Sequence, residues 1–324
     1  MDLTAALIVP TLNRQHDLIE TLRSWMGQTR PFDEVVVVEA GDLEATQHSL
    51  AEAGLAGSVR LIGSSPGLPR QRNVGVEHTR ADVVFFSDDD LTADPRNAEV
   101  LLAHFSRDED RSIGAAGGYV HDQGRPPRLL GHCTRKLFRL TRMSTRGCMQ
   151  RSGFPVFALM RQEGVVEVGV LSGTLAVRRE VFREFKFDER LEGYALMEDS
   201  DFSSRVGRRY RMVYDPAARS VHRVSPIGRK SLRDFCAMLV VNYHYLFRKN
   251  RAAGAYSWPA FWWANLGLVL YWGLIIGVQR RSWMPLRGLA RGFSMALRGK
   301  LWPATANARA SASATSASSQ PRGA

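Results

Sequence analysis

The stretch "DVVFFSDDDL", residues 82–91, joins an apolar strand directly to three carboxylates. Residues 83–87 are mostly Val and Phe and predict a buried strand, and Asp88, Asp89 and Asp90 follow it without a spacer. Adjacent like charges repel, so a hard divalent cation that neutralises them would explain their place at a strand end. The simpler alternative is a solvated acidic turn.

The residues around this stretch alternate between strand-like and helix-like runs. Runs that predict strands lie at residues 5–10, 34–41, 58–63 and 82–87, and runs with helical spacing lie at 16–28, 42–54, 67–79 and 95–105. Continuous apolar strands between amphipathic helices indicate an α/β fold with a mostly parallel sheet and helices on both faces. Ligands of such sheets bind outside the carboxyl ends of the strands, where the three aspartates lie.

The composition fits a globular intracellular protein. Hydrophobic residues make up 44% and charged residues 23% of the 324 residues, which is ordinary. Cys133, Cys148 and Cys236 are odd in number and widely spaced, so we expect neither a disulfide framework nor a zinc site, and we expect a reducing compartment. The first residues lead directly into a predicted strand, so we expect no secretion signal.

The net charge of +12 is concentrated at the C-terminal end. Residues 227–324 contain 14 Lys and Arg but only one acidic residue, Asp234, whereas residues 1–226 are nearly neutral. A basic region of this kind suits either nucleic acid or an anionic membrane surface. Nucleic-acid binding would call for aromatic residues interleaved with the cations, but four tryptophans gather in one uncharged run, residues 258–278. We therefore predict an anionic membrane surface as partner and no nucleic acid.

This uncharged run has the ~20 residues that cross a bilayer, and its tryptophans suit interfacial depth. Basic residues on both sides, together with Pro259 and Asn265 inside the run, weaken a simple crossing. An in-plane or re-entrant segment on anionic headgroups is favoured over a single crossing and over a buried core helix.

The chain divides into three predicted regions. Residues 1–226 form an α/β domain with a basic insertion at about 121–165, within which residues 125–161 hold nine Lys or Arg and no acid. Residues 227–302 form a helical, basic, membrane-associated region. Residues 303–324 are rich in Ala and Ser and predict a disordered tail.

Seven short motifs follow one another along residues 5–225. They are "PTLNR" (10–14), "VVVVEAGD" (35–42), "RNVG" (72–75), "DDD" (88–90), "SG" (172–173) with an Arg pair, "EDSDF" (198–202) and "SVH" (220–222). Each has a simpler explanation alone, such as an exposed basic helix face for "RNVG" or helix capping for the acids of "EDSDF". Their order resembles that of the family 2 glycosyltransferases, which have the GT-A fold and bind a nucleotide-sugar.

The resemblance implies a donor site with a bound cation. It assigns the nucleoside and donor to Pro10, Thr11, Asn13, Arg14, Glu39, Arg72, Asn73, Asp88 and Asp89. Within this set, Arg72 and Asn73 would lie near the phosphates. Glu39 stands where the family more often has Asp, which leaves the nucleotide base open. Asp90 of the DXD motif would coordinate Mg²⁺ or Mn²⁺ on the diphosphate, and His222 would be a further ligand or else a satisfied histidine.

The same resemblance implies how an acceptor is activated. Asp199 is expected to be the general base, Glu198 to support it or touch the acceptor, and Ser172, Gly173 and Arg178 to shape the acceptor side. Transfer of a sugar requires an activated hydroxyl and a stabilised diphosphate, and a carboxylate and a cation serve these two needs. Direct displacement inverts the anomeric carbon.

The predicted function is therefore an inverting, metal-dependent glycosyltransferase at the cytoplasmic face of the cell membrane. It would move a hexosyl or deoxyhexosyl group from a nucleotide-diphosphate sugar to a saccharide or lipid-linked acceptor in cell-surface glycan synthesis. One alternative is a nucleotidyltransferase, because such enzymes also combine an α/β sheet with aspartates. The other is a non-catalytic sugar-binding relative.

Overall fold

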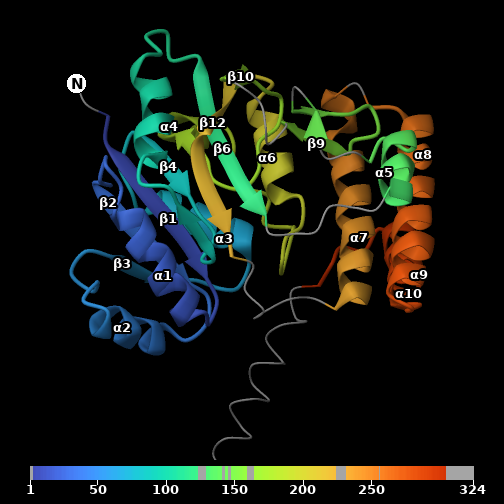
Figure 1. Ribbon diagram of the computed structural model, residues 1–324, viewed down its shortest axis with the longest axis horizontal. Coiled ribbons are helices and arrows are strands. Elements are labelled where there is room, and N and C mark those ends of the chain that lie inside the picture. The colour runs from blue at the N-terminus through green and yellow to red at the C-terminus, as the bar shows by residue number, and fades with distance from the viewer. Residues whose placement is uncertain are drawn as a thin grey trace, which may run out of the picture.

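The computed structural model describes residues 3–122, 129–140, 143–144, 147–158, 164–223, 231–254 and 256–303. A nine-stranded sheet forms its main part, with the order β10-β12-β6-β11-β4-β1-β2-β3 and with β5 paired to β12 (Figure 1). The strands are β1 (Ala5–Thr11), β2 (Glu34–Glu39), β3 (Arg60–Gly63), β4 (Val83–Phe86), β5 (Leu91–Ala93), β6 (Ile113–Asp122), β10 (Val166–Glu167), β11 (Leu175–Arg178) and β12 (Arg211–His222).

The four strands predicted from the first 90 residues are parallel and adjacent. In the register, Ile8 of β1 is opposite both Val36 of β2 and Phe86 of β4. Alternate side chains point to opposite faces, so Leu7 packs with α1 (Gln15–Met26) and α4 (Asn97–Ser106), whereas Ile8 packs with α3 (Leu68–Glu77) and α6 (Glu198–Val206). Helix α2 (Leu43–Glu52) joins the first of these layers. The predicted α/β fold, with helices on both faces of the sheet, is confirmed.

The other half of the sheet is mixed. Strand β11 is antiparallel to both β4 and β6, β12 is parallel to β6, and β5 and β10 are antiparallel to β12. Pro10 is tolerated in a central strand because β4 ends at Phe86, opposite Ile8, so Pro10 pairs only with Val38 of β2.

Capping residues, a glycine and a proline mark the starts of several helices. Asp42 caps α2 by accepting a hydrogen bond from Ala45 N. Gly67, with a φ of 147°, and Pro69 in the first turn begin α3. Ser231 caps α7 (Leu232–Asn250) by accepting from Asp234 N, and its hydroxyl donates to the Asp234 carboxylate.

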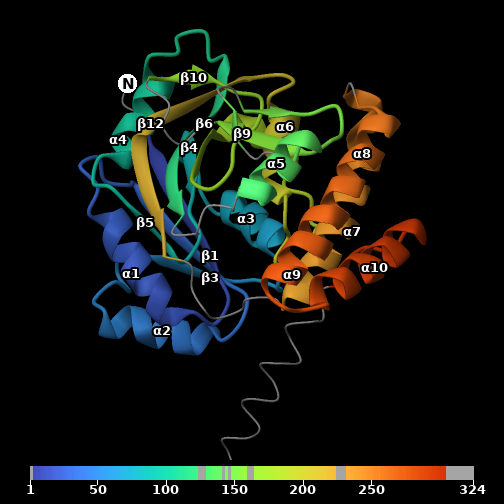
Figure 2. The same cartoon turned by 45° about the vertical axis from the view of Figure 1, so that its right-hand side comes forward.

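The C-terminal region is helical, as the pattern predicts. After α7 come η2 (Arg251–Ala253), α8 (Trp258–Leu268), a π-helical segment η3 (Val269–Ile276), α9 (Gly277–Gln279) and α10 (Met284–Leu297) (Figure 2). Helix α10 packs along α7, and α8 packs on α7 through Phe261, Ala264 and Leu268. Among the described residues one helix, Trp258–Gln279, is long and apolar enough to cross a membrane on length and composition.

The predicted insertion is described in part. It contains α5 (Leu129–Leu137) and a three-stranded sheet of β7 (Met143–Ser144), β9 (Pro155–Ala158) and β8 (Cys148–Met149). Phe138 and Leu140, after α5, pack in the same cluster as α7 and α8. The predicted tail from residue 304 onward lies outside the described residues, and the three-region division stays a prediction.

Candidate active site at the carboxyl ends of the strands

Two acidic motifs that are far apart in the sequence meet through one arginine. Arg72 of α3 donates from Nη2 to Asp88 Oδ1 at 3.0 Å and from Nη1 to Glu198 Oε1 at 2.5 Å. Asp88 lies two residues after the end of β4, and Glu198 is the first residue of α6. The structure therefore brings the aspartates after β4 and the acid pair of α6 to one place.

Helix α3 reaches this position because it packs closely on β1. A Cβ on Gly75 would lie 2.4 Å from Ile8 Cγ2, so only glycine fits there. One turn earlier, Gln71 Nε2 donates to Thr11 O and Val38 O, which ties α3 to the ends of β1 and β2. This packing explains the glycine of "RNVG" as a contact between helix and sheet.

Arg72 is buried but stays charged. Its side chain is 3% exposed, and its guanidinium lies 5.2 Å from the centre of the Phe187 ring. Burial lowers the pKa of Arg72, but Glu198, Asp88 and Asp199 more than offset this, so the net pKa is raised. Among the described residues, Arg72 Nε and Glu198 Oε2 are buried atoms without a hydrogen-bond partner.

The acid pair at the start of α6 has raised pKa values. Burial raises the pKa of Glu198 to about 8, against the opposing effect of Arg72. Burial also raises the pKa of Asp199, while Arg72 and the Ser200 backbone N–H oppose it. Asp199 Oδ1 accepts from Ser200 N at 2.6 Å, and within the described residues Oδ2 accepts no hydrogen bond. A partly exposed carboxylate with a raised pKa suits proton abstraction.

Asp89 holds the loop after β1. Its Oδ2 accepts from Thr11 Oγ1 at 2.8 Å, and its Oδ1 accepts from Arg14 Nη1 at 2.9 Å. Burial raises the pKa of Asp89 to about 6, while Arg14 and Thr11 lower it and Asp90 raises it. Thr11, Arg14 and Asp89, all predicted donor-site residues, therefore form one connected group.

Asp90 and His222 lie side by side. The pairing of β5 with β12 sets Leu91 opposite His222, and Asp90 Oδ1 is 3.1 Å from His222 Nε2. Adjacent ligands of one octahedral ion lie about 3 Å apart when each bond is about 2.1 Å long, so this pair fits a shared Mg²⁺ or Mn²⁺. The contact also satisfies the histidine without an ion.

The protein supplies only part of such a coordination shell. Among the described residues no group of three or more His, Cys, Asp or Glu side chains could hold a metal ion. A cation held by Asp90 and His222 would therefore take its other oxygens from a diphosphate and from water, which is the usual arrangement for Mg²⁺.

Glu39 and Asn13 build the turn after β1. Glu39 Oε1 accepts from Asn13 N at 3.2 Å and from Gly41 N at 2.7 Å, and its Oε2 accepts from Thr46 Oγ1 at 2.7 Å. Asn13 has a left-handed φ of 53°, and its Oδ1 accepts from Asp42 N. Because both oxygens of Glu39 have donors, this side chain shapes the loop, and a contact with the nucleoside stays a prediction.

Asn73 has a different place from the one predicted. Its Nδ2 donates to Phe187 O and Glu189 Oε1, and its Oδ1 accepts from Phe187 N. The amide is thus committed to holding the segment 187–189, which lies under Arg72. This placement does not support the predicted contact of Asn73 with phosphates.

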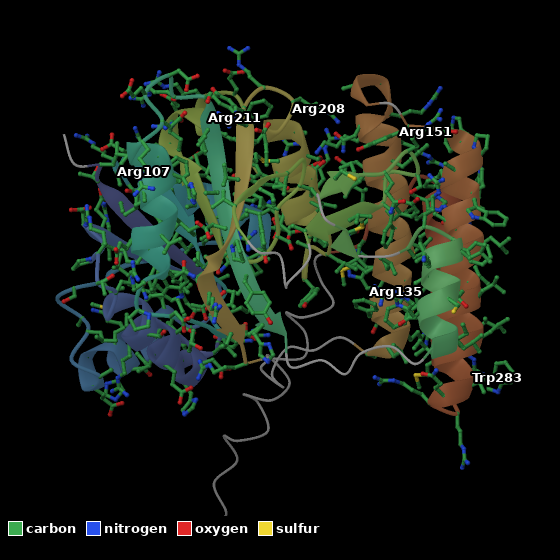
Figure 3. The ribbon with its side chains drawn as sticks, turned by 45° about the horizontal axis from the view of Figure 1, so that its top comes forward. Arg107, Arg135, Arg151, Arg208, Arg211 and Trp283 are labelled. Carbon is green, nitrogen blue, oxygen red and sulfur yellow. The ribbon has the colours of Figure 1, made fainter. Side chains whose placement is uncertain are left out.

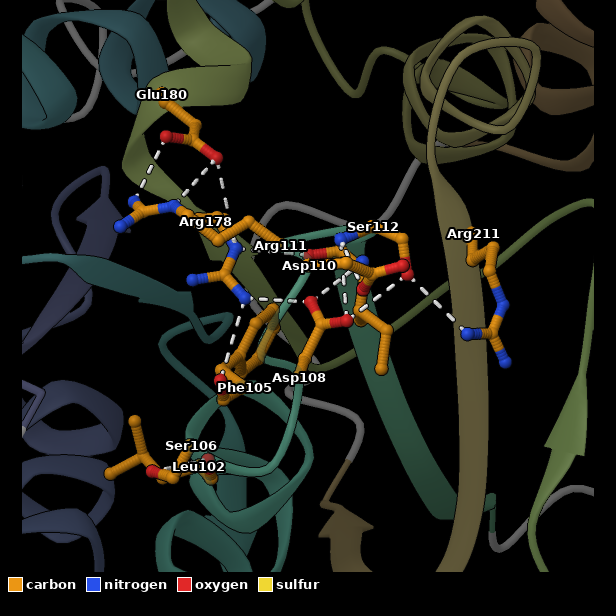
Figure 4. Close-up of polar contacts among 11 residues, drawn as sticks. Leu102, Phe105, Ser106, Asp108, Asp110, Arg111, Ser112, Arg178, Glu180 and Arg211 are labelled. Carbon is orange, nitrogen blue, oxygen red and sulfur yellow. Dashed lines mark hydrogen bonds and ion pairs between the residues drawn. The ribbon is translucent and has the colours of Figure 1, made fainter.

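The structure places Arg178 away from the acceptor side, where the sequence predicted it. In the antiparallel register it lies opposite Val83, at the other end of β4 from Asp88. It is buried, and it donates from Nη2 to Asp108 Oδ2 at 2.8 Å and from Nε to Ile113 O at 3.1 Å (Figure 4). Arg178 therefore belongs to a buried ion pair away from the site and does not shape the acceptor side.

Ser172 and Gly173 do lie at the expected edge of the sheet. They precede Leu175, which is opposite Phe86, so the chain reaches β11 from the end of the sheet that carries Asp88. Gly173 has a φ of 78°, and a Cβ there would lie 2.6 Å from Val120 Cγ2. Their role toward an acceptor stays a prediction.

Tyr194 was not predicted from the sequence. Its side chain is 49% exposed, and burial together with the charges of Asp88, Asp90 and Asp199 raises the pKa of its hydroxyl. A half-exposed ring therefore lies among the acidic residues. The signal in the sequence was an aromatic residue just before the "EDSDF" motif.

A family model and a curated relative match part of this chain. The family model "Glycosyl transferase family 2" matches residues 6–185, more than half of the chain. The hyaluronan synthase of Streptococcus pyogenes is 27% identical over 142 residues, which cover 41% of this chain and 33% of that protein. The aligned part is thus about a third of the length of that relative.

Solved structures share the fold at low sequence identity. A mannosyltransferase from Pyrobaculum calidifontis, in complex with GDP-Man and Mn²⁺, matches with a TM-score of 0.53, 18% identity, and coverage of 98% of this chain and 82% of that one. GalNAc-T7 with UDP, GalNAc and Mn²⁺ matches with a TM-score of 0.56 and 16% identity, and the match covers 86% of this chain and 57% of that one. These neighbours have the GT-A fold, and so does this chain.

Proposed function

Because this chain belongs to glycosyl transferase family 2, we propose that it is an inverting, metal-dependent enzyme that moves a sugar from a nucleotide-diphosphate donor to a saccharide or lipid-linked acceptor. The observation that carries this proposal is the bridge from Asp88 through Arg72 to Glu198, because it sets Asp199 beside the aspartates after β4. A donor-side group and a candidate base then share one site.

Asp199 is the proposed general base. Its raised pKa makes it a stronger proton acceptor than an ordinary aspartate, and a positioned base typically contributes about 10²–10⁴-fold to the rate. It would take the proton of the acceptor hydroxyl while the hydroxyl oxygen attacks the anomeric carbon. Attack from the side opposite the diphosphate inverts that carbon.

The other residues of the site hold the reacting groups in place. Arg72 fixes Glu198 relative to Asp88, and Asp89 fixes Arg14 and the loop after β1. Asp90 and His222 would hold the cation, which would supply Lewis-acid stabilisation of the diphosphate. Burial raises the pKa of Glu198, and this side chain would support Asp199 or contact the acceptor.

We further propose that the outer helices dock on an anionic membrane from the cytoplasmic side. Exposed apolar side chains gather on α5, on the helix Trp258–Gln279 and at the start of α10. We call them the outer apolar face, and they are Leu130, Leu137, Trp262, Trp263, Leu266, Leu274, Val278, Trp283 and Met284. Figure 3 shows Trp283 projecting from the end of these helices, away from the sheet. Arg280, Arg281 and Arg287 are exposed beside it, as contact with anionic headgroups requires.

The packing of the long apolar helix favours an in-plane position over a crossing. Phe261 and Leu268 are buried against α7 in the same cluster as Tyr243 and Phe247. His244 Nε2 and Asn265 Oδ1 also form a buried hydrogen bond at 2.9 Å. A crossing would remove this inner side from α7, whereas in-plane docking uses only the exposed side. A lipid-linked acceptor is consistent with this location.

Release of nucleoside diphosphate tests the proposed function. The full chain is incubated with a panel of UDP-, GDP- and dTDP-sugars, with a mixed lipid and saccharide acceptor fraction, and with Mn²⁺, Mg²⁺ or chelator. We expect release from at least one donor, dependent on the cation, and inversion of the anomeric configuration in the product. Transfer of a nucleotidyl group, or binding without turnover, would overturn the proposal.

A further inference from the structure

The helix that carries the proposed base is attached to α7 through a buried carboxylate. Asp201, two residues after Asp199, has a side chain with 0% exposure. Its Oδ1 accepts from Asn250 Nδ2 at 2.8 Å, and its Oδ2 accepts from Lys249 Nζ at 2.8 Å and from Arg205 Nε at 3.0 Å. The interpretation of Asp201 as a helix cap is therefore wrong, because its carboxylate is occupied by side chains from α7 and from the next turn of α6.

Lys249 also contacts Asp188, which follows the residue that packs against Arg72. Its Nζ donates to Asp188 Oδ2 at 2.6 Å, and Tyr245 Oη donates to the same oxygen at 2.7 Å. Burial raises the pKa of Asp188, but the hydrogen bonds from Lys249 and Tyr245 more than offset this, so the net pKa is lowered. Asp188 follows Phe187, whose ring lies against the Arg72 guanidinium.

Helix α7 also holds the loop that enters α6. Asn242 Nδ2 donates to Leu196 O at 3.0 Å. Ala195 and Met197 on either side of Leu196 have left-handed φ values of 48° and 76°, although neither is glycine. Both are buried in the cluster formed with α7 and α8. Strained backbone of this kind persists only where the surroundings fix it, and it is concentrated at functional sites.

We propose that Lys249 and Asn250 are positioning residues for the pair Glu198 and Asp199, so that α7 is part of the catalytic unit. This inference rests on the proposed function. Its physical basis is that one ammonium group joins α6 to the segment beneath Arg72, while Asn250 fixes the other oxygen of Asp201. Replacing a buried ion pair by apolar residues is often neutral for stability, and in this proposal the pair of Lys249 with the fully buried Asp201 serves to orient α6.

The test uses the full chain with Lys249→Met, Lys249→Arg and the control Arg209→Met. Arg209 forms an exposed ion pair with Glu184, at the far end of α6 from Asp199. The assay is release of nucleoside diphosphate with Mn²⁺. We expect Lys249→Met to lower kcat by about 10- to 100-fold, because small displacements of reacting groups have effects of this size. The KM for the donor should change less than kcat does, because Lys249 bonds directly to Asp201 of α6 but reaches Arg72 only through the segment 187–188.

Two further readouts separate positioning from simple loss of stability. The acid limb of the pH profile of kcat should shift in Lys249→Met, because Asp199 changes its surroundings, and Lys249→Arg should restore most of the rate. Arg209→Met should leave both unchanged. A folded Lys249→Met protein with wild-type kcat and pH profile would overturn the inference, as would a parallel loss of kcat and donor affinity.

If Lys249→Met does not fold, Asn250→Ala decides the question, since it removes one hydrogen bond without leaving a charge unpaired. We expect it to lower kcat by about 3- to 10-fold at an unchanged donor KM, and an unchanged kcat would overturn the inference. A wild-type chain inactive on every donor would refute the proposed function and this inference with it. An active wild type with equally active variants would refute the inference alone.

Discussion

Asp90 and His222 face each other across the pairing of β5 with β12, with Oδ1 and Nε2 3.1 Å apart. Asp90 belongs to the fourth of the seven motifs and His222 to the last, and the register of two strands brings them together. Because β5 directly follows Asp90, the strand pairing itself determines which histidine can approach that carboxylate.

Removal of the Asp90 carboxylate should abolish the response to metal. Asp90→Asn is expected to lower turnover by about 10²-fold or more, because an amide is a weaker ligand for a hard cation. Mn²⁺ added with UDP or GDP should raise the melting temperature of the wild type, and this increase should be lost in the variant. Asp94→Asn, a neighbouring change outside the site, is the control. An undiminished Mn²⁺-dependent increase in Asp90→Asn would contradict the assignment.

Asp199→Asn should separate chemistry from donor binding. Loss of the base is expected to lower kcat by about 10²–10⁴-fold, while the KM for the nucleotide-sugar stays within about 2-fold. Initial rates over a range of donor concentrations measure both parameters. The isosteric amide keeps the Ser200 hydrogen bond to Oδ1, so the melting temperature serves as the control for folding. Turnover at the wild-type rate would show that another group is the base.

The raised pKa of Glu198 makes a prediction about stability and pH. The folded pKa is about 8 and the ordinary value is 4.5, so between these pH values the folded state holds a proton that the unfolded state has lost. The free energy of unfolding should therefore fall as pH rises from about 5 to 8. In Glu198→Gln this fall should be smaller by about 1 kcal/mol or more, since one proton accounts for up to about 1.4 kcal/mol per pH unit.

Urea unfolding of the wild type and of Glu198→Gln at pH 5 and pH 8 measures this difference. Only the pH-dependent part is compared, because glutamine also changes the bond with Arg72 at both pH values. Equal pH dependence in the two proteins would mean that Glu198 titrates normally.

Much of the fold follows from local patterns. The alternation of apolar runs and amphipathic helices predicts the parallel half of the sheet, and the place of Asp88 follows because β4 ends just before it. Thr11 and Arg14 are likewise brought to Asp89 because β1 and β4 are parallel neighbours, whose carboxyl ends meet at one edge.

The residues that were misplaced depend on pairings over long distances in the sequence. Arg178 was predicted at the acceptor side, but β11 is antiparallel to β4. Leu175 therefore lies at the end of β11 near the site, and Arg178 lies at the other end. Asn73 looked like a phosphate ligand, but its partners are Phe187 and Glu189. Asp201 looked like a cap, but Lys249 is its partner. No local pattern contains this information, because an ion pair leaves no periodic signal.

The corrected place of Arg178 predicts a loss of stability without a catalytic defect. Arg178 and Asp108 are each only 2% exposed, so Arg178→Met would leave a buried carboxylate without its cation. We expect destabilisation of about 3–5 kcal/mol, and kcat per folded molecule within about 2-fold of the wild type. Arg111→Met, which breaks an exposed pair with Glu180, should lower stability by less than about 1 kcal/mol. Urea unfolding and active-fraction kinetics measure these effects, and a specific fall in kcat would return Arg178 to the site.

The outer apolar face makes a prediction about lipid binding that distinguishes docking from crossing. Trp262 and Trp263 are 46% and 45% exposed, so replacing both by Ala removes apolar area from the proposed contact. The inner part of each ring packs on Phe261 or Phe138, so the melting temperature of the variant is the control for folding. We expect the double variant to bind vesicles containing anionic lipid at least about 10-fold more weakly, since each buried aromatic ring contributes on the order of 1.5–3 kcal/mol. Flotation of the full chain with anionic and with neutral vesicles measures this.

High salt and alkaline carbonate provide the complementary measurement. A docked helix whose inner side stays on α7 should be released from vesicles by these washes, because its lipid contact is interfacial and partly electrostatic. A crossing helix would resist both and would need detergent. Tyr194→Ala, far from the apolar helices in sequence and exposed among the acidic residues, is the matched control and should float like the wild type. Retention after carbonate would refute the in-plane position, because a helix held only by its exposed side has no means of resisting extraction.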